Sequence, residues 1–111
     1  MTEGEQSQDE AFRSEIEAVI EEDDIEEVLG ATIEIALGSS DPIWATECLI
    51  RLAQHPDTDV RGNAMIGFAH LAGRFEDFEK EKALPVLEAG LQDLKPHVRE
   101  QAEAALGELK D

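Results

Sequence analysis

A stretch of this chain occurs twice, and this repetition restricts the available folds more than any other feature of the sequence. The segment "VRGNAMIGFAHL" from residue 60 and the segment "VREQAEAALGEL" from residue 98 share the pattern V-R-x-x-A-x-x-small-(F/L)-small-x-L. Matching positions lie 38 residues apart. Because a period of this length holds two helices and their turns, the chain is predicted to consist of repeated helix pairs.

A weaker copy of the pattern precedes these two. It begins at Leu29, 31 residues before Val60, and places Ile33 and Leu37 at matching positions. The intervening segments "ATECLIRLAQHPDTDV" and "ALPVLEAGLQDLKPHV" also align without a gap. The aliphatic positions of the repeat are predicted to fill the layer between paired helices. Small residues, which let helices approach closely, stand at positions 64, 67, 102 and 105.

Helical periodicity and capping signals predict six helices and no strand. Ser7 has capping-box spacing, Asp41 precedes a proline, and Thr58 or Asp59 is expected to cap the fourth helix. The predicted helices cover about residues 8–22, 24–38 and 42–54, the stretch after the turn "HPDTD", about residues 80–93, and the stretch from Val98 to the end.

Length and charge restrict the domain organisation and the partners. The 111 residues fit one domain, predicted over residues 9–111, after a disordered acidic tail over residues 1–8. The formal net charge is −18, from 27 acidic and 9 basic residues. Such a charge repels phosphate backbones and anionic membranes, so we expect a basic protein partner and no nucleic acid or membrane. Without a signal peptide or a long apolar run, the protein is expected to be cytoplasmic.

The sequence contains no pattern typical of catalysis or metal binding. Cys48 is the single cysteine and lies on an apolar helix face, which predicts a small buried hydrophobe. The three histidines show no metal-ligand spacing. The turn "DTDVRG" begins like a calcium loop, but Arg61 takes the fifth ligand position and Phe68 the place of the closing glutamate. We therefore expect no enzyme activity, no metal and no cofactor.

The repeated segments resemble HEAT-like repeats, in particular the short variety first noted in phycobilin lyases. The resemblance spans about residues 24–110 and implies an all-α fold, a short right-handed α-solenoid of about six helices. The His-Glu pairs that hold iron in the HEAT-like deoxyhypusine hydroxylases have no counterpart here, and HEAT-like DNA glycosylases need a basic groove. By resemblance, the second helix of each pair lines the concave face, and the outward positions there are Glu47, Arg51, Gln54, Glu81, Glu88 and Gln92.

Trp44, the single tryptophan, stands at the border of an apolar helix face, and two interpretations are open. In one, neighbouring helices bury Ile43 and Ile50 on the opposite side of this helix. In the other, Trp44 and both isoleucines form an exposed contact patch rimmed by Glu47 and Arg51.

These observations favour a non-enzymatic module that captures a basic protein, and the resemblance suggests an immunity protein that neutralises a toxin such as a nuclease. The candidate partner-binding residues are Glu22, Asp23, Asp24, Trp44, Glu47, Arg51, Glu81 and Glu88. The acidic run from residue 21 to residue 27 is alternatively only a solvated turn and helix start. The alternative functions are a bilin lyase or chaperone and a self-associating scaffold, so a monomer or a weak homo-oligomer is expected.

Overall fold

Six α-helices joined by short turns make up the chain, in a computed structural model that describes residues 2–109. The helices are α1 (Thr2–Glu22), α2 (Ile25–Gly38), α3 (Pro42–Leu52), α4 (Thr58–Arg74), α5 (Lys80–Gly90) and α6 (Pro96–Leu109). The predicted all-α domain of about six helices is confirmed. Parts of the predicted tail and last helix, namely Met1, Lys110 and Asp111, lie outside the described residues.

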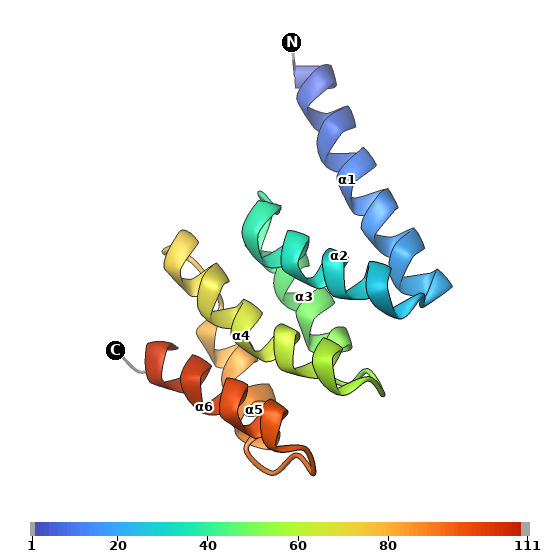
Figure 1. The fold of residues 1–111 in the computed structure, drawn as a ribbon. Coiled ribbons are helices and arrows are strands. Elements are labelled where there is room, and N and C mark those ends of the chain that lie inside the picture. Colours follow the sequence, from blue (N-terminus) through green and yellow to red (C-terminus); the bar gives the residue numbers. More distant parts are fainter. Residues whose placement is uncertain (1, 110–111) are drawn as a thin grey trace.

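The helices form two layers (Figure 1). α2, α4 and α6 lie side by side in one layer, and α3 and α5 pack behind them. α4 is the central helix, because it contacts α2 and α6 in its own layer and α3 and α5 in the other. α1 meets α2 at the turn between them and then diverges from it (Figure 1).

The first helix begins earlier than the periodicity predicts. α1 starts at Thr2, so Ser7 lies inside the helix and the prediction that it caps the helix is wrong. The segment from residue 2 to residue 8 is rich in glutamate and glutamine, which have good helix propensity. Negative charge is also favourable near a helix N-terminus. Most of the predicted tail is therefore described as the first turns of α1.

Aspartates cap three of the helices. Asp24, Asp41 and Asp57 accept hydrogen bonds from backbone amides in the first turns of α2, α3 and α4, at 2.9–3.4 Å. The cap predicted at Asp41 is confirmed. The cap predicted for α4 at Thr58 or Asp59 is wrong by one or two positions, because both residues already lie within the first turn.

The core lies between the two layers and is built around α4. Val60, Phe68 and Leu71 of this helix are completely buried, as are Leu49 of α3 and Leu87 of α5. The four small residues predicted at helix contacts are all buried as well. The repeated pattern therefore describes packing positions, as the sequence predicts.

Gly67 shows why a small residue is needed in the middle of α4. A Cβ atom added to it would lie 3.0 Å from the Leu49 Cδ1 atom and 3.5 Å from the Ala36 Cβ atom. Those two neighbours belong to α3 and α2, so Gly67 lies where three helices approach one another. A larger side chain here would have to push two helices outward.

The first, weaker copy of the repeat has a different register from the predicted one. Val28 and Thr32 are completely buried in α2, whereas Leu29 is half-buried and Ile33 and Leu37 are exposed. The Thr32 hydroxyl donates to the Val28 carbonyl oxygen at 2.7 Å, which satisfies this buried polar group. A shift of one residue rotates a helix by about 100°. The apolar residues predicted to pack at positions 33 and 37 consequently face outward.

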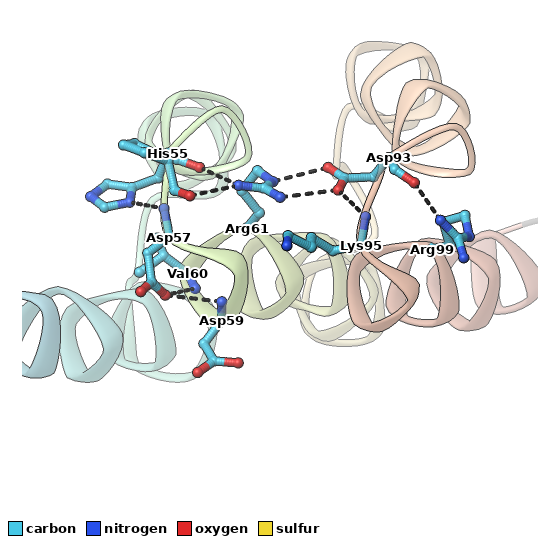
Figure 2. A network of polar contacts seen from close by, with 9 residues as sticks. His55, Asp57, Asp59, Val60, Arg61, Asp93, Lys95 and Arg99 are labelled. Carbon is cyan, nitrogen blue, oxygen red and sulfur yellow. Dashed lines mark hydrogen bonds and ion pairs between the residues drawn. The ribbon is translucent and has the colours of Figure 1, made fainter.

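The α3–α4 turn and the α5–α6 turn contain the same polar contacts (Figure 2). Arg61 donates to the carbonyl oxygen of His55, six residues earlier, at 3.0 Å, and Arg99 donates to that of Asp93, also six residues earlier, at 2.7 Å. The backbone amide two residues after His55 donates to its Nδ1 atom at 2.9 Å. The amide two residues after Asp93 likewise donates to its carboxylate at 2.9 Å. The imidazole and the carboxylate thus play equivalent parts in the two turns.

Arg61 also ties the two turns together. Its Nε and Nη2 atoms donate to the two carboxylate oxygens of Asp93 at 2.9 and 3.0 Å (Figure 2). The hydrogen bond from Arg61 is the main reason that the pKa of Asp93 lies below its ordinary value. The same bond raises the pKa of Arg61. This bidentate pair joins the start of α4 to the α5–α6 turn.

None of the helices described between residues 2 and 109 is both long and apolar enough to cross a bilayer.

Candidate protein-binding surface

The predicted site residues lie in three separate places. Three of them surround the α1–α2 turn, three belong to α3, and two belong to α5. In that order they are Glu22, Asp23 and Asp24; Trp44, Glu47 and Arg51; Glu81 and Glu88. All are exposed except Trp44, which is half-buried. The α3 and α5 residues belong to the layer opposite α2, α4 and α6.

The acidic turn between α1 and α2 has structural roles. Asp24 caps α2, as described above. Asp23 adopts a left-handed backbone conformation, with φ of 59°, that ends α1. Aspartate tolerates this conformation better than most residues. The Asp23 Oδ1 atom lies 2.5 Å from the Nε2 atom of His55, so this carboxylate connects the α1–α2 turn to the α3–α4 turn.

Trp44 packs beneath α1. Its ring meets the Phe12 ring edge-on with centroids 5.9 Å apart, and the Arg13 guanidinium lies 5.5 Å from its centroid. The indole Nε1 atom donates to the Glu17 carboxylate at 3.3 Å. Burial of Ile43, one of the two predicted alternatives, is wrong because its side chain is exposed; Ile50 is half-buried. Because α1 uses the indole ring, the alternative of a free patch centred on Trp44 loses its main residue.

Arg51 also binds α1. Its Nη2 atom donates to the Glu17 carboxylate at 2.9 Å and to the Cys48 Sγ atom at 3.5 Å. The hydrogen bond to Glu17 is the largest contribution that raises the pKa of Arg51. Cys48 is buried in the core, as predicted, and this burial raises the pKa of its thiol.

A groove of about 510 Å³ lies between α1 and α2. The buried or half-buried lining residues Ile16, Val19 and Ala31 form an apolar floor, and the exposed carboxylates Glu15, Glu27 and Glu34 form an acidic rim, with the exposed Ala18 also lining the groove. Gly30 also lines it, and a Cβ atom added there would meet nothing within 4 Å. The missing side chain of Gly30 therefore leaves this part of the groove open.

Sequence reasoning missed Glu15 and Glu34 of the rim; Glu27 belongs to the acidic run that it considered, but it was not among the candidate partner-binding residues. Glu27 and Glu34 stand seven residues apart, two helical turns, and therefore share one face of α2. This spacing is a visible signal. Their meeting with Glu15 of α1 depends on how the two helices diverge after the turn, and no local pattern specifies that angle.

Two exposed aliphatic side chains stand beside this groove. Ile33 and Leu37 of α2 are 49% and 54% exposed. On the side of α4 they border a small hollow that Ile66 and His70 also line. α2 thus presents an acidic groove on one side and an apolar strip, Ile33 and Leu37, along its outer face.

Within the part of the chain that the structure describes, no three His, Cys, Asp or Glu side chains are grouped so as to hold a metal ion. The fold and this surface define an all-helical, six-helix domain with an acidic groove. No family model, no curated protein and no solved structure matches the chain.

Proposed function

We propose that this protein is a non-enzymatic binding module that captures a basic protein partner through an acidic surface. The observation that carries the proposal is the α1–α2 groove, in which Glu15, Glu27 and Glu34 surround an apolar floor. A lysine or arginine side chain suits such a site, because its aliphatic stem packs on the floor while its charged end meets carboxylates. The net charge of −18 extends this attraction beyond the contact itself.

A HEAT-like repeat arrangement is part of the proposal. The turn contacts of Arg61 and Arg99 support it, because they recur at the spacing of 38 residues found in the sequence. The layer of α2, α4 and α6 also agrees with stacked helix pairs. Among proteins with this build, one that neutralises a basic toxin such as a nuclease suits the charge of the chain best.

The alternatives of the sequence analysis receive less support. A bilin carries propionate carboxylates, which the acidic rim of the groove would repel. A scaffold of self-associated copies would bring two chains of charge −18 together.

The proposal is tested by titrating the ¹⁵N-labelled protein with a short lysine oligomer and mapping the amide shifts by NMR. The variant is the triple substitution Glu15→Gln, Glu27→Gln and Glu34→Gln. The matched control removes the same net charge from exposed sites elsewhere: Glu76→Gln, Glu100→Gln and Glu103→Gln.

We expect the largest shifts in the groove, and binding weakened about tenfold or more by the groove triple, which is about 1.4 kcal/mol. The control triple should change affinity much less. Equal weakening by both triples, or shifts spread evenly over all acidic segments, would contradict a defined binding site and reduce the effect to net charge.

A further inference from the structure

The exposed apolar strip beside the groove points to a particular kind of partner segment. We propose that the segment is a basic amphipathic helix that lies along α2. Its apolar side would cover Ile33 and Leu37, and its lysines or arginines would reach the carboxylates of the groove. This inference rests on the function proposed above and specifies the partner of the same surface.

The strip and the groove form one continuous surface on α2. Gly30, Ile33 and Leu37 follow one another at spacings of three and four residues, so they share one face of the helix. Gly30 lines the groove, which places the first member of this line inside it. From Glu27 to Leu37 the helix advances about 15 Å, which matches about three turns of a partner helix.

The groove between α1 and α2 supplies part of the surface on which such a helix would lie. The two helices meet at the Asp23 turn and separate toward the C-terminal end of α2 (Figure 1). The groove of about 510 Å³ occupies the space between them. A helix laid along α2 would contact the half-buried Val19 near the α1–α2 turn and the exposed Leu37 at the other end of α2.

Charge decides which kind of partner covers the strip. Glu26 and Glu34 of α2 are exposed as well, and the chain as a whole carries a net charge of −18. A second copy of the chain would bring further carboxylates against these, and an anionic membrane would be repelled in the same way. A segment that joins leucine-like and lysine-like residues on adjacent faces satisfies both the apolar strip and the acidic rim.

The test uses two fluorescein-labelled peptides of equal length and equal leucine and lysine content, each of about five helical turns. One has all leucines on one helix face, and the other has the same residues scrambled around the helix. Binding to the full-length protein is measured by fluorescence anisotropy. We expect the amphipathic peptide to bind at least tenfold more tightly than the scrambled one.

Variants of the strip and of the groove show which surface distinguishes the amphipathic peptide from the scrambled one. The double variant Ile33→Ser with Leu37→Ser should abolish the preference for the amphipathic peptide. The control Leu94→Ser, which removes an apolar side chain that is 92% exposed in the α5–α6 turn, should keep this preference.

Gly30→Trp, which fills the groove, should weaken binding of both peptides. Gly107→Trp on α6 is the matched control, because a Cβ atom there also meets nothing within 4 Å, and it should not weaken binding. Circular dichroism verifies that each variant is folded.

The outcomes separate this inference from the proposed function. If both peptides bind equally and the glutamine triple in the groove weakens both, the acidic binding module stands and the amphipathic helix is wrong. If neither peptide binds at low salt, the proposed function itself fails. If Leu94→Ser removes the preference as strongly as the double variant does, the strip is not the contact surface and the inference is overturned.

Discussion

At the residue scale, the Arg61 side chain holds two turns of the chain together. Arg61 donates to two backbone carbonyl oxygens of the α3–α4 turn and to both carboxylate oxygens of Asp93 in the α5–α6 turn. The two side chains are only 16% and 17% exposed. A bidentate pair in such a site is worth more than an exposed ion pair, because water competes less well for the same groups.

The Asp93→Asn substitution should therefore destabilise the protein in a pH-dependent way. Because the pKa of Asp93 is lowered in the folded protein, its contribution is complete above the unfolded pKa, about 3.9, and is lost as pH falls through the folded value. We expect a loss of about 1–3 kcal/mol at pH 7 from urea unfolding.

The difference between the wild-type protein and Asp93→Asn should begin to narrow below about pH 4, where the unfolded wild-type chain takes up a proton, and should narrow further as the pH falls through the lower pKa of the folded carboxyl group. Asp77→Asn, in an exposed position between α4 and α5, is the matched control and should change little. A loss that stays constant from pH 7 to the acid range would show that the carboxylate charge is not responsible.

At the element scale, the packing of α4 against α2 and α3 depends on the absence of a side chain at Gly67. Gly67→Leu would place atoms where Leu49 and Ala36 already lie. We expect it to cost about 1–3 kcal/mol or more in urea unfolding, because both neighbouring helices must move. Gly73→Leu is the control on the same helix, since nothing lies within 4 Å of a Cβ atom there. That variant should be neutral or slightly stabilising, because leucine has the better helix propensity.

The attachment of α1 is a second property of an element, and Trp44 reports it directly. The ring of Phe12 covers part of the indole ring, so Phe12→Ala should expose it and shift the tryptophan emission to longer wavelength. Because Phe12 is half-buried, the loss of stability should stay below the 3–5 kcal/mol typical of a fully buried phenylalanine. Phe78→Ala, another half-buried phenylalanine between α4 and α5, should leave the emission maximum unchanged.

The predictability of each element follows from how local its signal is. The equivalence of α4 and α6 could be predicted because two good copies of one pattern stand 38 residues apart. The register of α2 could not be predicted, because its own apolar residues occur on more than one face of the helix. Ile25, Val28 and Ile33 all look suitable for a core, yet only Val28 is buried. Packing against α4 makes that choice.

The candidate site was less predictable for the same reason. The acidity of the first quarter of the chain is plain in the sequence, but the groove requires Glu15 and Glu34 to come together from two helices. Trp44 looked like a contact residue because it stands at the edge of a helix face. Its actual neighbours, Phe12 and Glu17, lie about 30 residues away, beyond any helical period.

At the scale of the whole molecule, repulsion among the acidic side chains destabilises the fold. The chain holds 27 acidic and 9 basic residues, so most carboxylates have no cation available to them. The ion pair between Arg51 and Glu17 is about half exposed, at 51% and 45%, and such pairs contribute little. Repulsion among the remaining carboxylates should therefore outweigh attraction within the pairs.

Salt should accordingly stabilise this protein. Raising the ionic strength from about 0.01 M to about 0.15 M shortens the Debye length from about 30 Å to about 8 Å, which screens distant repulsion more than it weakens pairs in contact. We expect the thermal unfolding midpoint to rise by about 4 °C or more, which corresponds to about 1 kcal/mol for a domain of this size. Sodium chloride and a larger monovalent salt should give the same rise at equal ionic strength, because the effect is screening. A midpoint that falls with added salt would mean that the ion pairs dominate the electrostatic energy of the fold.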